Sequence, residues 1–479
     1  MKPFLRHSIT ACTPLAASLA LLMSSPITLA QSVEQKADQD SAYTRGKTAL
    51  AARDGQTAIT EFSQCLNEQP QNVECHWELG WSFFLTHDYK KAHATWLTVK
   101  RMTPKRPGLT KVLNTINEHL VLTTQAQALR AASPPSFAAT AAGTSIKIHA
   151  VGDTMLGTNF PRNLLPPGDT PPLKKITPLL KGADITFANY EGTLCDGGES
   201  EKCAVPVNRG TTASKVASNC FAFRSPKKFA TQLQDAGFDV ISLANNHILD
   251  FGEECRDQSE KILDDLGIAW SGRQGTVARF ERHAIPFSFI AFHSALHANT
   301  TLDTEMAQDM IAAEKALGRR VIISFHGGAE GLQAMHVPNK AEVFMGENRG
   351  HVRRFARAAV DAGADIVLGS GPHVVRGMEV YKDRLIAYSL GNFATYRVFN
   401  IWGLSGIGLI LEAELDDTGR FIAGKIIPTH QTGFGTPVLD EKMIATDVIR
   451  VLSQQDFPDS GVLIAQDGTL QKKHNMQPD

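Results

Sequence analysis

Short apolar segments alternate with amphipathic segments over the larger part of this chain, from residue 145 onward. The short segments have the length and composition of strands, and the one at 240–244 is nearly all apolar, as a buried strand is. We expect strands at 146–151, 184–188, 240–244, 268–270, 287–292, 321–325, 366–368, 379–381 and 385–390. We expect helices at 176–180, 226–236, 258–266 and 349–362. This alternation predicts a layered α/β fold.

The residues before this region follow a different pattern, in which large and small side chains recur with a period of 34 residues. Large and small residues at fixed offsets allow antiparallel helices to interlock, and a proline ends each unit. The pattern resembles a pair of tetratricopeptide repeats with a third helix at 109–128 as a cap; a generic pair of helical hairpins is the alternative. Such repeats usually bind a partner. The matching positions are Tyr43 and Trp77, Gly46 and Gly80, Leu50 and Phe84, Ala58 and Ala92, Phe62 and Trp96, and Pro70 and Pro104.

The first residues of the chain have the features of a targeting segment. Lys2 and Arg6 precede a mostly apolar stretch at 16–23, and small residues stand just before Gln31. This is the pattern of a cleaved secretory signal, and the stretch is short for the alternative, an uncleaved membrane anchor. We therefore expect export across the inner membrane to the periplasm or the cell surface, with no transmembrane segment in the mature chain.

These patterns together predict the organisation of the chain. A low-complexity segment separates the repeats from the α/β region, as a linker does. The C-terminal residues are polar and carry no motif, so we expect a loosely packed tail around one helix at 443–452. The expected parts are a signal peptide at 1–30, helical repeats at 31–130, a linker at 131–144, an α/β domain at 145–430 and the tail at 431–479.

Composition and charge narrow the possible functions. The chain has 479 residues, 43% of them hydrophobic and 20% charged, with a formal net charge of -1. These values fit a globular protein of several domains and give no electrostatic basis for binding nucleic acid. Removal of Cys12 with the signal peptide would leave six of the seven cysteines, and an even number suggests disulfides in an exported protein. Local spacing favours the pairs Cys65–Cys75, Cys195–Cys203 and Cys220–Cys255; six free buried thiols are the alternative.

The predicted strand at 240–244 ends in a cluster of chemically active side chains. Asn245, Asn246 and His247 follow it directly, and Asp250 stands three residues after the histidine. The C-terminal ends of parallel strands are where α/β proteins place their ligand sites. An asparagine oxygen can bind a hard metal ion, a histidine can transfer a proton, and an aspartate can fix the tautomer of that histidine. An asparagine-rich turn with a surface histidine is the alternative.

Other predicted strands also end in residues that bind metals. Taken singly, each of these residues could serve a turn, a helix cap or a solvated loop, but together they favour a metal site. The set suits one or two divalent ions such as Mn, Fe, Zn or Mg, and the lack of cysteine disfavours a structural zinc site. The candidate ligands are Asp153, Glu191, Asn246, His326 and His373.

Such a site usually performs hydrolysis of phosphate esters. A bound cation lowers the pKa of its water and provides hydroxide near neutral pH. His247, oriented by Asp250, is the candidate for protonating the leaving group. Asn245, Glu330 and Asn392 are candidates for substrate contact, although Asn392 also fits a tight turn.

Motifs occur in order at 151–157, 188–191, 244–247 with Asp250 and Gly252, 326–330, 363–365, Gly369 with 372–374, and 388–393. In these motifs the region 145–415 resembles the bacterial capsule-synthesis protein CapA family, which is associated with poly-γ-glutamate and is similar in fold to the calcineurin-like metallophosphoesterases. The resemblance implies a four-layer α/β sandwich with metal ions at the strand ends, and it does not cover the repeats. The family usually has a further histidine just before Pro-His, where Ser370 and Gly371 stand here. This departure predicts that one metal ion is incompletely coordinated or absent.

Two functional hypotheses follow from these observations. In the first, the protein is an exported metal-dependent hydrolase in the production of poly-γ-glutamate or a related envelope polymer, with an anionic polymer or a phosphoester as substrate. In the second, it is a non-catalytic scaffold whose repeats bind the polymer synthesis machinery and whose degenerate metal site binds polymer without turnover. A plain periplasmic phosphoesterase or nucleotidase is a third possibility and rests on fold analogy alone.

Overall fold

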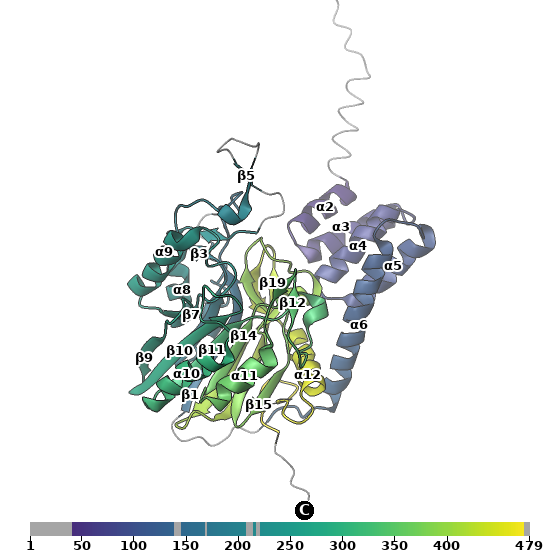
Figure 1. The fold of residues 1–479 in the computed structure, drawn as a ribbon. Coiled ribbons are helices and arrows are strands. Elements are labelled where there is room, and N and C mark those ends of the chain that lie inside the picture. Colours follow the sequence, from purple (N-terminus) through teal and green to yellow (C-terminus); the bar gives the residue numbers. More distant parts are fainter. Residues whose placement is uncertain (1–40, 138–144, 168–169, 207–213, 217–220, 474–479) are drawn as a thin grey trace, which may run out of the picture.

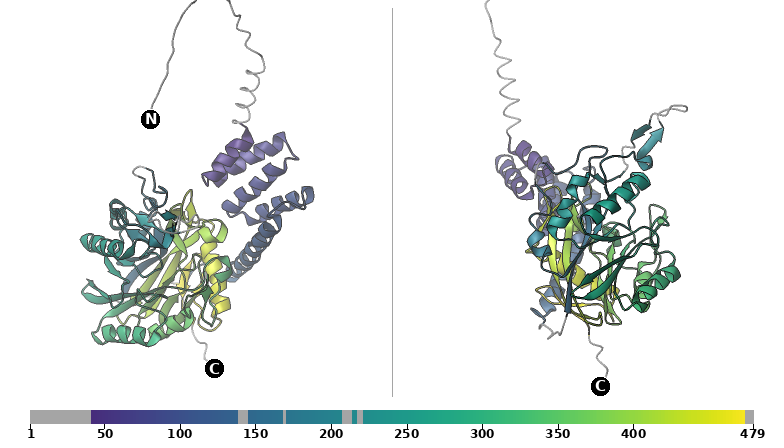
Figure 2. Two further views of the ribbon diagram at one scale, coloured as in Figure 1. Left: turned by 45° about the horizontal axis from the view of Figure 1, so that its top comes forward. Right: turned by 90° about the vertical axis from the view of Figure 1, so that its left-hand side faces the viewer.

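A computed structural model describes residues 41–137, 145–167, 170–206, 214–216 and 221–473. The chain forms an α/β domain with a helical domain along one side of it (Figure 1), and Figure 2 shows the same arrangement from two other directions. The predicted signal peptide and Cys220 lie outside the described residues. Within the described part of the chain, no helix combines the length and the apolar character needed to span a membrane.

Consecutive antiparallel helices form the N-terminal domain. The same contact closes each helical hairpin, because Phe62 packs against Gly46 and Trp96 packs against Gly80. Hairpins with the predicted period are therefore present, whereas their assignment as tetratricopeptide repeats stays a prediction. The helices are α2 (Ala42–Ala51), α3 (Gly55–Glu68), α4 (Val73–Leu85), α5 (Tyr89–Met102) and α6 (Leu109–Ala132).

Two sheets form the middle of the α/β domain. The larger has the order β21 (Leu463–Ile464), β22 (Thr469–Gln471), β19 (Phe421–Thr432), β18 (Ile407–Asp416), β1 (Ser145–Met155), β2 (Ile185–Tyr190), β7 (Val240–Ser242) and β8 (Ala269–Ser271), with β17 (Asn392–Thr395) beside β1 and β20 (Thr436–Leu439) beside β19. The smaller has the order β15 (Met378–Tyr381), β16 (Arg384–Ala387), β14 (Ile366–Ser370), β11 (Arg320–His326), β10 (Ile285–His293) and β9 (Ala278–Arg282). The helices of this domain are α7 (Thr177–Leu180), α8 (Thr231–Ala236), α9 (Gly252–Asp265), α10 (Thr304–Ala316), α11 (Val352–Asp361) and α12 (Ile444–Asp456).

The two sheets pack face to face between two layers of helices. Side chains of a strand alternate between its two faces, so Phe187 of β2 points to the smaller sheet and contacts Phe289, with ring centroids 5.6 Å apart. Val151 and Ala188 belong to the core under α7, α8 and α9. On the other side, Ile311 of α10 and Phe355 of α11 cover the outer face of the smaller sheet. The predicted four-layer α/β sandwich is confirmed.

The helical domain is attached to the sandwich by a packed interface as well as by the linker. The segment between β17 and β18 reaches into it, where the Trp402 ring packs on Trp81 with centroids 5.8 Å apart. The backbone N–H of Leu404 donates to Nε2 of His119 at 3.3 Å, and the Gly403 carbonyl lies 3.1 Å from a ring nitrogen of His87. These contacts bury apolar and polar groups of both domains, so they fix the segment 402–404 relative to the repeats.

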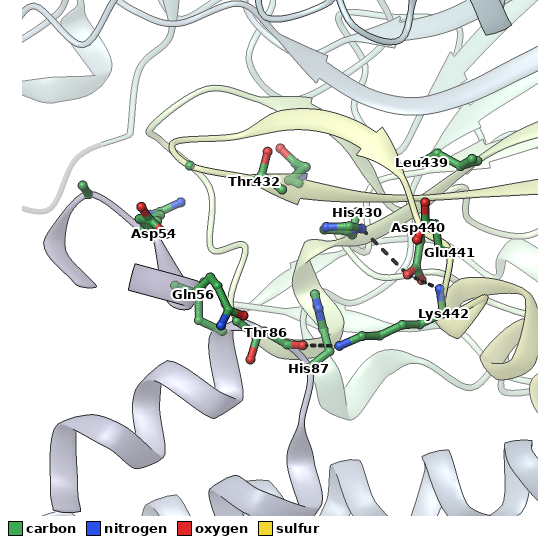
Figure 3. A pocket seen from close by; sticks show the side chains of 16 residues that line it. Asp54, Gln56, Thr86, His87, His430, Thr432, Leu439, Asp440, Glu441 and Lys442 are labelled. Atoms are coloured by element: carbon green, nitrogen blue, oxygen red, sulfur yellow. Dashed lines mark hydrogen bonds and ion pairs between the residues drawn. The ribbon is translucent and has the colours of Figure 1, made fainter. Parts of the chain in front are cut away.

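A cavity of about 570 Å³ lies beside this interface, between the turns of the helical hairpins and the β19–β20 hairpin (Figure 3). Across it, the Lys442 ammonium donates to the Thr86 carbonyl at 2.8 Å. His430 and Asp440 face each other on the wall formed by the β19–β20 hairpin, 3.8 Å apart. The cavity therefore has polar contacts on both sides, which add to the attachment of the two domains.

The expectation of a loosely packed tail at 431–479 is wrong for the described residues, which extend to 473. α12 is buried between α6 and the sheets, with Val448, Ile449 and Leu452 fully inaccessible. β22 also binds the start of the predicted linker, since Thr469 Oγ1 accepts a hydrogen bond from the N–H of Phe137 at 2.9 Å. The sequence pattern missed this because one short apolar helix between polar segments does not reveal what it packs against.

The disulfides agree only in part with the local pairing. Cys65 bonds Cys75 as expected, but Cys195 bonds Cys255, 60 residues away, and Cys203 is also disulfide-bonded. α9 packs on β3 (Thr193–Leu194), and this contact brings the two distant cysteines together. The structure therefore corrects the predicted pairs Cys195–Cys203 and Cys220–Cys255.

The close approach of Trp96 to Gly80 predicts a stability effect. A methyl group at residue 80 would overlap the indole, and overpacking of this kind costs about 1–3 kcal/mol. We expect Gly80→Ala to lower the free energy of unfolding and the Tm, measured by chemical and thermal denaturation. Gly197→Ala is the matched control, because nothing lies within 4 Å of the added methyl group. Equal stability of the two variants would contradict the proposed packing.

Candidate metal centre

Strands of both sheets deliver polar side chains to one place. Asp153 lies near the end of β1, Glu191 directly follows β2, and His326 ends β11 of the other sheet. Possible ligand atoms of these three residues lie within 4.8 Å of one another, and all three side chains are completely buried. Two carboxylates and an imidazole at this spacing form a group that can hold a divalent ion.

His373 joins the group from the loop after β14. Its Nδ1 lies 3.0 Å from Asp153 Oδ2 and 3.1 Å from Asn392 Oδ1, and its Nε2 lies 3.6 Å from Glu191. The backbone of His373 has a φ of 56°, which is uncommon for a residue with a side chain. The Asn392 amide donates to the His373 carbonyl at 3.2 Å, so the loop is held in this conformation by its neighbours. The arrangement places one more imidazole beside both carboxylates.

The position where the CapA family usually has another histidine is closed to a side chain. Gly371 has a φ of 111°, and a Cβ atom there would lie 2.9 Å from the backbone nitrogen of Gly327. The neighbouring Ser370 hydroxyl instead lies 3.2 Å from Nδ1 of His326. A hydroxyl that accepts a hydrogen bond from the Nδ1–H of this histidine fixes the tautomer whose unprotonated Nε2 is available for a metal. The departure therefore removes one possible ligand and supports another.

His247 and Asp250 form a buried dyad beside this group. His247 Nδ1 lies 2.7 Å from Asp250 Oδ2, and its Nε2 lies 3.7 Å from Glu191. Asp250 also accepts hydrogen bonds from the Lys202 ammonium at 2.7 Å and from the Phe223 N–H at 2.8 Å. Burial lowers the pKa of His247, and the Asp250 carboxylate opposes this effect. The dyad therefore fixes the tautomer of His247 and directs its Nε2 to the centre.

Several polar atoms at the centre lack the partners that buried polar atoms normally have. Within the described residues, neither carboxylate oxygen of Glu191 has a hydrogen-bond partner, and the same is true of Asn246 Oδ1 and His326 Nε2. These are oxygen and imidazole atoms of the kinds that bind Mn, Fe, Zn or Mg. The group of Asp153, Glu191 and His326 therefore fits a divalent cation, which would satisfy the unpaired atoms of Glu191 and His326; the role of Asn246 as a ligand stays a prediction.

Burial and neighbouring charges change the protonation of these groups. Burial raises the pKa of the Glu191 carboxyl well above its ordinary value. Burial alone would lower the pKa of His373, but the nearby carboxylates of Glu191, Asp153 and Glu330 raise it to about 10. Burial lowers the pKa of His326 well below its ordinary value. His326 is thus neutral and ready to bind a metal, whereas His373 must first lose a proton.

The remaining candidate residues occupy different places. Asn245 is fully buried; its amide donates to the Tyr190 carbonyl at 2.8 Å, and its oxygen accepts from the His247 N–H at 3.0 Å. Glu330 lies at the edge of the centre, 3.8 Å from His373 and 3.1 Å from Arg349. Asn245 thus shapes the turn that carries His247, and Glu330 is close enough to meet a substrate.

Some residues around the centre were not identified from the sequence. The Asn189 amide donates to Asp153 Oδ1 at 2.8 Å, and His293 Nδ1 donates to the His326 carbonyl at 2.8 Å. Both stand at strand ends, which is the signal that identified the other residues. The ring of Phe399 packs on His373 with centroids 4.6 Å apart. It comes from a loop without strand or motif, so no sequence signal pointed to it.

A comparison with protein families identifies this arrangement. The model of the bacterial capsule synthesis protein family PGA_cap matches residues 147–397, which is more than half of the chain. The chain belongs to this family. The matched segment contains all of the candidate site residues, and the predicted resemblance to CapA proteins is confirmed.

Two named relatives are similar at low identity. The capsule biosynthesis protein CapA of Bacillus anthracis is 24% identical over 311 residues, which cover 60% of this chain and 68% of that protein. The PGA biosynthesis protein CapA of Bacillus subtilis (strain 168) is 26% identical over 324 residues, covering 64% and 77%. The solved NAD nucleotidase of Haemophilus influenzae aligns over 64% of this chain and 56% of its own, with 13% identity and a TM-score of 0.31. That score is too low to bear on fold or function.

The raised pKa of His373 predicts that metal affinity depends on pH. With a pKa of about 10, His373 is protonated between pH 6 and pH 8, and a metal ligand must be deprotonated. Binding therefore releases this proton and any proton that the Glu191 carboxyl holds, so the affinity for Mn²⁺ should rise with pH by about tenfold per unit for each proton released. Calorimetric titration at pH 6, 7 and 8 measures this slope.

His373→Gln is the variant that tests the origin of the slope. It removes the proton-releasing ligand, so the pH dependence should decrease by about one proton and the affinity should fall. His93→Gln, on helix α5 of the other domain, should leave both unchanged. A pH-independent affinity of the unmodified protein would contradict this assignment of His373.

Proposed function

We propose that this protein is a divalent-metal-dependent hydrolase that acts outside the cytoplasm in the production of a capsule or envelope polymer. The carboxylate of Glu191 is the observation that carries the proposal. It is completely buried, and neither of its oxygens has a hydrogen-bond partner among the described residues. A buried carboxylate without hydrogen bonds is costly even with histidines 3.6 to 3.8 Å away, and a bound cation would offset this cost.

The residues of the chain divide into those that hold a cation and those that move a proton. Asp153, Glu191, Asn246, His326 and His373 are the residues that would hold one. A divalent ion there supplies Lewis acidity and a water of lowered pKa. Since the dyad directs the Nδ1–H of His247 to Asp250, Nε2 is the atom that exchanges a proton with the reacting group. Lys202 holds Asp250 in place by its 2.7 Å contact.

Family membership and the helical domain support the biological setting of the proposal. The Bacillus relatives are named for capsule and PGA biosynthesis, so poly-γ-glutamate or a related polymer is the candidate product. The signal-like N-terminus favours the periplasm or the cell surface. The repeats are the candidate contact for the synthesis machinery.

One observation favours a non-catalytic scaffold as the second candidate. The conformation of Gly371 excludes the histidine that most family members have at this point, so fewer protein ligands are available than in the family pattern. A site of this kind can bind a metal or a polymer without turnover. The two candidates differ in whether His247 is needed.

Activity assays distinguish the two candidates directly. We expect the protein with Mn²⁺ to hydrolyse bis-p-nitrophenyl phosphate, and we expect His247→Gln to lower kcat by about 10²–10⁴ while metal content is retained. Asp153→Asn should lose both metal and activity. His93→Gln, in helix α5, serves as the control. Full activity of His247→Gln would exclude the assigned proton transfer.

Complementation of a deletion strain tests the scaffold. The hydrolase proposal predicts that a double variant, Asp153→Asn with His247→Gln, fails to restore polymer production although it is exported and folded. Restoration to the wild-type level by this variant would favour the scaffold instead. Immunoblotting of the periplasmic fraction confirms that equal amounts are compared.

A further inference from the structure

An open groove of about 560 Å³ lies between the helical domain and the sandwich. This volume falls within the range of small-molecule sites, roughly 300–1,000 Å³. Helices α2, α4 and α6 form one wall, and the loops at 332 and 400–402 form the other. Its floor contains two half-buried indoles, Trp81 from the repeats and Trp402 from the sandwich, whose planes are nearly perpendicular, at 78°.

Two chain segments connect the candidate metal centre with the groove. Phe399 packs on His373, and the next residue, Asn400, lines the groove. Glu330 lies 3.8 Å from His373, and Leu332, two residues later, lines the groove as well. Two residues span at most about 7 Å, so both loops lead from the centre directly to the groove. The two sites are therefore neighbours in the fold.

The charges of the groove exclude some occupants. Lys47 donates to Glu78 at 2.8 Å, so the lining has no uncompensated charge. A polyanion binds where cations are left unpaired, which is not the case here. A purely alkyl chain would cover the exposed Asn400 and the Lys47–Glu78 pair without satisfying their hydrogen bonds, and this is unfavourable.

A sugar ring meets both requirements of this surface. Its C–H face can lie on an indole, whose π face is electron-rich, and its hydroxyl groups can bond to polar side chains at the edge. Asn400, Thr115 and the Lys47–Glu78 pair supply such donors and acceptors beside the two indoles. We propose that this groove binds a neutral saccharide segment of the substrate that the metal centre acts on, with Trp81 and Trp402 as stacking platforms. Only the statement that the saccharide is part of the substrate rests on the proposed function; binding in the groove does not.

Binding is measured on the full chain with neutral hexasaccharides. Chitohexaose, cellohexaose and maltohexaose are the probes, and a γ-glutamyl hexamer is the anionic comparison. Calorimetry and tryptophan fluorescence should show binding of at least one hexasaccharide. Trp402→Ala and Trp81→Ala should weaken it about fivefold, because one stacking contact is worth roughly 1 kcal/mol. Trp81→Phe, which keeps a ring, should recover part of the loss.

Two further variants separate binding from folding. Asn400 is exposed and its Oδ1 accepts from the backbone N–H of Trp402 at 3.0 Å, so Asn400→Asp, which keeps this acceptor and removes the amide donor, should weaken saccharide binding without lowering the Tm. Trp270→Ala, in strand β8, is the tryptophan control and should bind as the unmodified protein does. No binding of the three hexasaccharides at millimolar concentration would overturn the proposal. Preferential binding of the γ-glutamyl hexamer that is lost in the tryptophan variants would also overturn it.

The test separates this inference from the proposed function. Binding needs neither metal nor turnover, so Asp153→Asn should bind the hexasaccharide normally. Saccharide binding without any hydrolysis by the unmodified protein would support the proposed saccharide groove and contradict the proposed hydrolase activity. Hydrolysis of phosphoesters without saccharide binding would support the hydrolase and contradict the saccharide groove.

Discussion

The burial of two carboxylates at the seam between the two sheets is the constraint on which the rest of the structure depends. Asp153 and Glu191 come from the larger sheet, and the histidines that face them come from the smaller one. Face-to-face packing of the sheets therefore assembles the centre, and the hydrophobic layers that bring the sheets together also bury its carboxylates. A charge in such a place needs a partner, so the local chemistry and the fold impose the same requirement.

The segment from β17 to β18 connects this constraint to the helical domain. At one end, Asn392 holds the loop of His373; in the middle, Phe399 packs on the ring of that histidine; at the other end, Trp402 is held by the repeats. Asn392 also donates to the carbonyl of Ser405 at 3.2 Å. One short segment thus touches both the centre and the helical domain, so a change in the packing of the repeats can reach His373 through contacts that the structure shows.

The sequence predicted the elements and the centre better than it predicted what lies between them. Strand ends could be recognised because a buried apolar run followed by a carboxylate or a histidine is a local pattern, and the parallel arrangement brings such ends together. The Cys195–Cys255 bond and the buried α12 depend on which elements pack side by side, and local spacing does not carry that information. Phe399 could not be identified from the sequence for the same reason, because the role of a loop residue depends on which residues the fold places next to it.

The missing histidine at Gly371 and the open groove beside Trp402 are connected by the positioning of the substrate. Because the centre has one histidine fewer than the family pattern, fewer of its side chains can position the reacting group. Contacts made by distant parts of a substrate can supply the missing orientation, because binding energy away from the reacting atoms can be used to position them. The groove is attached to the centre by two short loops, and half of it is built from the helical domain. Under the proposed saccharide binding, the helical domain, which lies outside the segment that the family model matches, contributes part of the substrate site.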